Sequence, residues 1–79
     1  MNEKLKQIFA SSLGIDESLV HDGLKYAEIP QWDSVAHMGL VSNIENEFEI
    51  MMDTDDVIGM SSFAVAREIV GKYGVKFDA

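Results

Sequence analysis

Apolar residues recur every three or four positions in three stretches of the chain, which is the spacing of one helix face. The first stretch predicts a helix over residues 2–13, with Asn2 as its N-cap and Gly14 as its stop. The others predict helices over residues 34–49 and 62–73. The residues expected to be buried are Leu5, Ile8, Phe9, Leu13, Leu40, Val41, Ile44, Phe48, Phe63, Ala66, Ile69, Val70 and Tyr73. Because no alternation with period two is sustained, the pattern predicts an all-α fold.

Two connections separate these helices. A structureless segment as long as residues 14–33 is uncommon in a compact domain. Apolar residues recur along it, so we expect an ordered crossover held on the core by Ile15, Leu19, Val20, Leu24, Tyr26 and Ile29. Residues 52–60 predict one short helix, with Thr54 as its cap and acids in its first turn. The expected architecture is a bundle of three longer helices and one short helix, with a long first loop.

Composition narrows the functional classes. The 79 residues are expected to form one domain, 1–79, and 47% hydrophobic residues suffice for a packed core. The chain has no cysteine, so it has neither disulfides nor a thiolate nucleophile of its own. A net charge of −8 argues against nucleic acid and predicts partners with basic surfaces. With no span of about 18 apolar residues and no apolar leader in MNEKLKQIF, we expect a cytoplasmic protein without a membrane span.

The stretch IPQWDSVAHMGL holds the main candidate site. Asp33 suits the N-cap of the second predicted helix, which leaves Ser34 as its first residue with the hydroxyl facing outward. A helix N-terminus carries unpaired N–H groups and a partial positive charge, both of which favour a phosphate. The dipeptide taken alone is compatible with two interpretations, an ordinary helix start or a serine to which a phosphate-linked group is attached.

The neighbours of Ser34 carry weaker signals. His37 lies one turn further on and could approach such a phosphate, but we expect a solvated histidine. A catalytic Ser34–His37 pair would need an orienting acid and an oxyanion site, which the spacing does not supply. Trp32 is either a partner contact or the packing anchor of the loop. Gly39 inside a helix reflects either a close approach by a neighbouring segment or by a partner, or a tolerated surface glycine.

Other motifs are assigned structural roles. The stretch DTDDVIG has acids at calcium-loop spacing, but apolar residues stand where that motif needs a ligand oxygen and a glycine, so no metal site is expected. Ser61 or Ser62 is expected to cap the last helix. Four methionines are expected to fill the core: Met38, Met51, Met52 and Met60.

Three stretches together resemble the acyl carrier protein family. DSVAHMGLVSNIENEFEI is similar to that family's helix-start signature, LGIDESLV to the opening of its first loop, and MSSFAVAREIV to its last helix. The resemblance spans nearly the whole chain in the same order. It implies an acyl-carrier-type four-helix bundle in which a phosphopantetheinyl transferase attaches 4′-phosphopantetheine to Ser34, with Asp33 at the recognised helix start.

The resemblance also implies a role for the missing cysteine. The thiol of the attached arm would carry acyl groups as thioesters, and the chain itself would be a non-catalytic monomeric carrier. Carriers of primary fatty acid synthesis usually have acids soon after the serine, whereas this chain reads Ala36-His37-Met38-Gly39. The sequence therefore looks more like free-standing carriers of specialised pathways, such as polyketide, unusual lipid or surface-polymer assembly. A peptidyl or aminoacyl carrier, or an unmodified helical interaction module, remains an alternative.

The expected docking surface for loading and processing enzymes surrounds the serine. Val35 and Met38 would offer apolar contact, while Glu45 and Glu47 begin an acidic rim that attracts basic partners. The competing interpretation is that these acids only solvate the bundle.

Overall fold

The computed structural model describes residues 3–74 and is built from helices joined by loops. The elements are α1 (Glu3–Leu13), the 3₁₀ helix η1 (Glu17–Leu19), α2 (Ser34–Phe48), α3 (Thr54–Gly59) and α4 (Phe63–Lys72). Within residues 3–74 the only extended pairing is an isolated antiparallel bridge between Lys25 and Ser62. The predicted all-α class is confirmed, and the predicted cap Asn2 lies outside the described residues.

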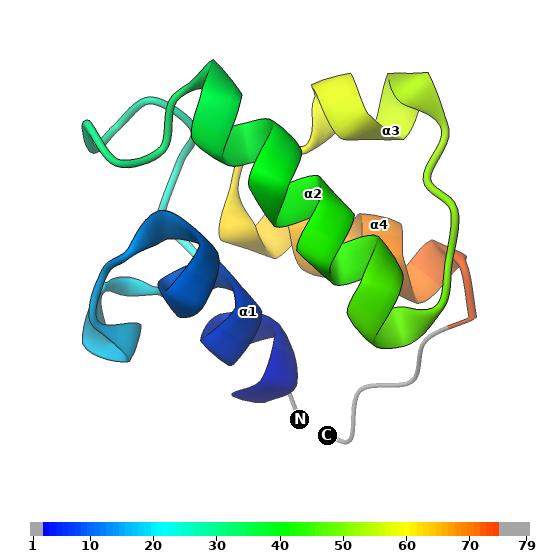
Figure 1. Cartoon of the computed structure of the whole chain (residues 1–79), viewed down its shortest axis with the longest axis horizontal. Helices are drawn as coiled ribbons and strands as arrows, with labels where there is room; N and C mark the ends of the chain where they lie inside the picture. Colours follow the sequence, from blue (N-terminus) through cyan, green and yellow to red (C-terminus); the bar gives the residue numbers. More distant parts are fainter. Residues whose placement is uncertain (1–2, 75–79) are drawn as a thin grey trace.

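Helix α2 forms the centre of the bundle (Figure 1). It packs against α1. In Figure 1 the short α3 lies near the beginning of α2, and α4 lies behind α2. The core gathers apolar side chains from α1, α2, α4 and the loops, and the partly buried Val57 of α3 packs against it. Its largest fully buried side chains are Trp32, Phe9, Phe63, Leu5, Leu40, Ile44, Met60, Val20 and Val70.

The helix boundaries follow from local chemistry. After α1, Gly14 adopts a φ of 67°, and the Ile15 N–H donates back to the Ala10 carbonyl at 3.0 Å, which closes the helix end as predicted. At the start of α4, Ser62 is the N-cap, and its hydroxyl accepts the Val65 N–H at 3.1 Å. The predicted capping role of Ser62 is therefore confirmed.

The start of α3 differs from the sequence prediction. Asp53, with φ −67° and ψ 153°, occupies the N-cap position, and Thr54 is already the first helical residue. The Asp53 side chain makes no capping hydrogen bond; its backbone N–H donates instead to the Tyr73 hydroxyl at 2.9 Å. The helix thus begins one residue earlier than predicted, and Thr54 was the wrong cap.

The predicted core residues are largely confirmed, with exceptions at the helix ends and in the loop. Phe48 and Tyr73 are only half-buried because they lie at the last turns of their helices. In the loop, Val20 and Leu24 are buried, but Leu19 and Tyr26 are exposed. The crossover is thus fixed by fewer apolar contacts than predicted.

The methionines divide into two groups. Met52 and Met60 are buried and fill the core as predicted, whereas Met38 and Met51 are 60% and 83% exposed. The prediction was wrong for the exposed pair, because the flexible methionine side chain fills cores but also serves at binding surfaces. Among the described residues, no helix combines the length and apolarity needed to cross a membrane.

Candidate functional site

The start of α2 has the geometry expected from the sequence. Asp33 is the N-cap, and its carboxylate accepts the Ala36 N–H at 2.9 Å, while its carbonyl accepts the His37 N–H at 2.8 Å. Ser34 is the first helical residue and is exposed. The serine hydroxyl is therefore held on a rigid helix at a positively polarised terminus, where a modifying enzyme can reach it.

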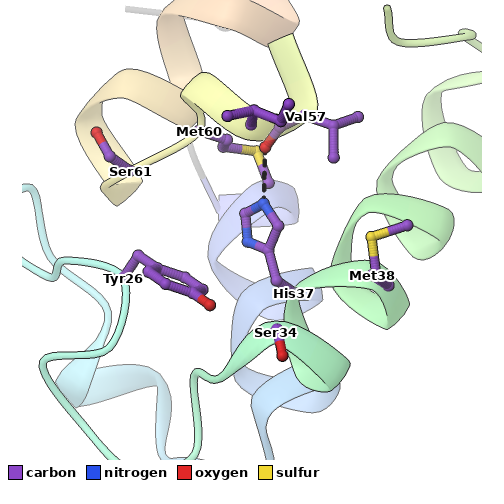
Figure 2. A pocket seen from close by; sticks show the side chains of 8 residues that line it. Tyr26, Ser34, His37, Met38, Val57, Met60 and Ser61 are labelled. Atoms are coloured by element: carbon purple, nitrogen blue, oxygen red, sulfur yellow. Dashed lines mark hydrogen bonds between the residues drawn. The ribbon is translucent and has the colours of Figure 1, made fainter. Parts of the chain in front are cut away.

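An apolar groove opens beside Ser34, between the first turns of α2 and the short α3 (Figure 2). We call it the Ser34 groove; its volume is about 340 Å³. Its lining combines residues from the loop, α2, α3 and the segment before α4: Tyr26, Ser34, His37, Met38, Val57, Ile58, Met60 and Ser61. A chain attached at Ser34 would thus meet apolar surface at once.

His37 is buried in this groove, which overturns the predicted solvated histidine. Its Nδ1 lies 3.0 Å from the Trp32 indole Nε1, and its Nε2 lies 2.8 Å from the Val57 carbonyl oxygen. Because an indole N–H can only donate, Nδ1 accepts, and the neutral ring must carry its hydrogen on Nε2 and donate it to Val57. Sequence spacing gave no sign of this, since Val57 lies 20 positions away and reaches His37 only in the folded chain.

Trp32 is a packing anchor, which decides between the two interpretations of that residue. It is fully buried, and its ring is nearly parallel to the His37 ring, with the centroids 6.1 Å apart. The rings of Trp32 and Phe9 meet edge-on, with their centroids 5.3 Å apart. Losing the partner of a buried polar group typically costs about 1–3 kcal/mol. The contacts Trp32–His37–Val57 therefore join the loop, α2 and α3 directly beneath Ser34.

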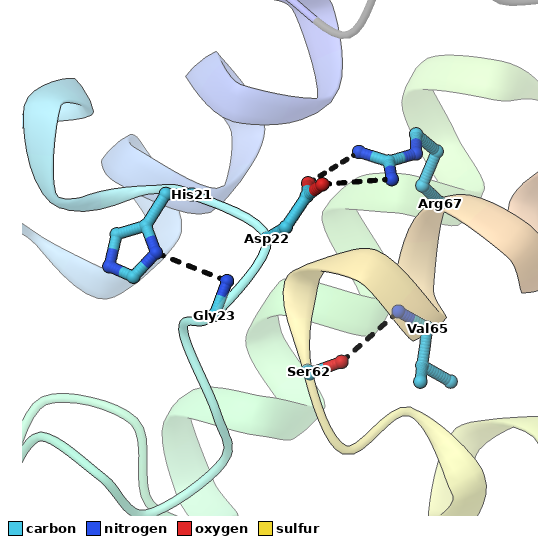
Figure 3. Close-up of polar contacts among 6 residues, drawn as sticks. All are labelled: His21, Asp22, Gly23, Ser62, Val65 and Arg67. Atoms are coloured by element: carbon cyan, nitrogen blue, oxygen red, sulfur yellow. Dashed lines mark hydrogen bonds and ion pairs between the residues drawn. The ribbon is translucent and has the colours of Figure 1, made fainter.

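The long loop that delivers Ser34 is fastened to α4 (Figure 3). Arg67 donates two hydrogen bonds to Asp22, at 2.7 and 3.3 Å, and these hold the pKa of the Asp22 carboxyl below its usual value. Next to this pair, the Phe63 N–H donates to the Leu24 carbonyl at 2.9 Å. These contacts define where the loop runs although part of its apolar surface is exposed.

The predicted docking residues near the serine are accessible. Val35 is 80% exposed and Met38 is 60% exposed, so both can offer apolar contact. Sequence reasoning missed Ile58, which is 75% exposed and lines the same groove from α3. A helix as short as α3 has too few residues for periodicity to show which side faces the core.

Several acids of the predicted rim make contacts within the chain. Glu45 is half-buried, and its carboxylate accepts the Met52 N–H at 2.9 Å, whereas Glu47 pairs with Lys4 at 2.8 Å. Asp56 accepts from Lys72 at 2.8 Å, and this contact lowers the pKa of the Asp56 carboxyl. Part of the acidic charge thus serves the fold. Among residues 3–74 no three acids or histidines are arranged to hold a metal ion.

Comparison with known proteins identifies the fold. No family model matches the chain, and no curated protein matches its sequence. Among solved structures, it is similar to the NMR structure of a holo acyl carrier protein from Geobacter metallireducens, with a TM-score of 0.80 and 21% identity over 92% of this chain and 86% of that one. The likeness shows that the chain has the fold of an acyl carrier protein, as the resemblance in sequence implied.

Proposed function

We propose that this chain is a carrier protein whose Ser34 bears 4′-phosphopantetheine and whose arm holds acyl groups as thioesters. The observation that carries the proposal is the exposed Ser34 hydroxyl at the first position of α2, with Asp33 as N-cap, in a fold shared with a holo acyl carrier protein. A phosphodiester there would lie at the positive end of the helix dipole. The arm would bring the thiol that a chain without cysteine lacks.

The Ser34 groove supports the acyl class of cargo. It is lined by apolar side chains such as Met38, Val57 and Ile58 and lies next to the attachment point. Burying apolar surface stabilises a bound hydrocarbon by about 0.8 kcal/mol for each methylene. An acyl intermediate of fatty acid, polyketide or related specialised biosynthesis fits this surface better than a charged aminoacyl or peptidyl group.

Intact mass tests the proposal. The chain is incubated with a broad-specificity phosphopantetheinyl transferase and its substrate, and one arm is expected to attach. Ser34→Ala should abolish the mass increase, whereas Ser42→Ala, a matched exposed serine on α2, should retain it. Modification that survives Ser34→Ala would refute the assignment. A chain that never accepts the arm would support the alternative of an unmodified interaction module.

We further propose that the transferase and the acyl-loading enzymes dock around Ser34. Because the arm must enter their active sites, a partner has to cover Val35 and Met38, with the acids further along as a rim that attracts basic surfaces. Exposed Ser34 and the exposed apolar pair support this arrangement. The cytoplasmic setting expected from the sequence belongs to the same proposal.

Binding kinetics separate the two parts of this docking surface. Met38→Ala should mainly increase the dissociation rate, and Glu47→Lys should lower the association rate at low salt. Lys4→Ala is the control, since it breaks the Lys4–Glu47 ion pair but keeps the acid. Equal association rates for wild type and Glu47→Lys at low salt would show that Glu47 is only a solvated or structural acid.

A further inference from the structure

Residues that line the Ser34 groove differ sharply in exposure, which defines a rim and a floor. Met38 and Ile58 form the rim, at 60% and 75% exposed. His37 and Met60, at 8% and 1%, form the floor. Figure 2 shows the His37 ring projecting from α2 toward α3, across the space between them. A chain that enters beside Ser34 therefore reaches the His37 ring as it goes deeper.

The His37 ring is fixed from two sides. Nδ1 accepts the Trp32 indole N–H and Nε2 donates to the Val57 carbonyl, so turning the ring aside would break both hydrogen bonds. Behind the His37 ring, Trp32 is fully buried against Phe9. The rings of Phe9 and Phe63 also meet edge-on, with their centroids 5.0 Å apart. Close-packed aromatic rings leave no room for the floor to retreat.

We propose that His37 determines specificity by limiting the length of apolar chain that the Ser34 groove can hold. The inference rests on the proposed function in taking that chain to be the carried acyl group. With roughly 30 Å³ of close-packed volume for each carbon group, packing gaps included, a volume of about 340 Å³ holds about eleven carbons. Longer chains would leave their remaining carbons in water or on a partner enzyme.

The experiment attaches alkyl chains of increasing length directly at position 34, without the phosphopantetheine arm. Because the chain has no cysteine, Ser34→Cys creates a single thiol at the groove. Its thiolate forms a mixed disulfide with alkyl methanethiosulfonates of about two to fourteen carbons, and methanesulfinate leaves. The melting temperature and the fluorescence of Trp32, the sole tryptophan, are measured for each adduct.

The melting temperature is expected to rise by about 2 °C for each half-buried carbon and to level off at about eleven carbons. In His37→Ala the plateau should move about two carbons further, because the removed ring frees space in the groove. His37→Gln should keep the original plateau, since its amide offers one acceptor and one donor to the same partners. His21→Ala, a change at an exposed histidine outside the groove, should also leave it unchanged.

A further measurement tests the contact between the alkyl chain and His37 without a substitution at His37. In the adduct of about eleven carbons, the length that fills the groove, NMR should detect proximity between the terminal methyl and the imidazole protons of His37. A melting temperature that keeps rising to fourteen carbons, an unchanged plateau in a folded His37→Ala, or the absence of methyl–imidazole proximity would each overturn the inference. Failure of the transferase to modify Ser34 would instead refute the proposed function and leave these results intact.

Discussion

Gly39 is expected to be a site at which alanine stabilises the protein. It lies in the middle of α2, is exposed, and an added Cβ would meet no atom within 4 Å. Within residues 3–74, no neighbouring segment therefore requires glycine there. Glycine in a helix interior costs about 0.5–1 kcal/mol relative to alanine, mainly through the backbone entropy that it loses on folding.

Gly39→Ala should accordingly raise the free energy of unfolding by about 0.5–1 kcal/mol, or the melting temperature by about 3–6 °C for a domain of this size. Urea titration followed by circular dichroism measures it, with the midpoint rising and the slope unchanged. Gly14→Ala is the opposing control. Its added Cβ also meets open space, but φ is 67°, so alanine should destabilise by about 1 kcal/mol.

One result would refute this reasoning, and another would assign the glycine to partner binding. Destabilisation by Gly39→Ala would mean that α2 is not a regular helix at this point. A stabilised variant that the transferase modifies more slowly would show that a partner, and not the chain, needs the close approach that glycine allows. Unimpaired modification of a stabilised variant would establish a tolerated surface glycine.

Three further predictions concern stability. Asp33→Ala should cost about 1 kcal/mol in urea unfolding by removing the N-cap of α2, while Asp33→Asn should cost much less because its amide oxygen still accepts the hydrogen bond. Trp32→Phe should cost about 2–3 kcal/mol, since it shrinks a fully buried ring and leaves His37 Nδ1 without its donor; a smaller loss than 1 kcal/mol would contradict the buried hydrogen bond. The depressed pKa values of the carboxyls of Asp22 and Asp56 mean that their ion pairs stabilise the fold above the unfolded-state pKa of about 4 and lose that effect as pH falls through the folded-state values. Unfolding measured from pH 6 to 2 should thus show a weaker acid dependence when both are changed to asparagine, and identical profiles would refute the assignment.

The sequence by itself determined the three long helices and the helix start at which we propose the attachment. Three long helices were predicted to within a residue or two at their ends, because a core-facing stripe repeats with the helix period and the caps are local. The same applies to the helix start at Asp33 and Ser34, where the N-cap bond joins residues three positions apart. Local spacing also predicted the stop at Gly14, which has a positive φ.

Only the tertiary structure decided what surrounds Ser34. The burial of His37 depends on Val57, 20 positions away, and the groove depends on how the short α3 lies against α2. The acidic residues of α2 also show which features the sequence determined and which the tertiary structure decided. The sequence located Glu45 and Glu47 on α2 but not their partners Met52 and Lys4. Hydrogen bonds and ion pairs between distant segments form once packing has brought the segments together, and local residue patterns contain no information about those pairings.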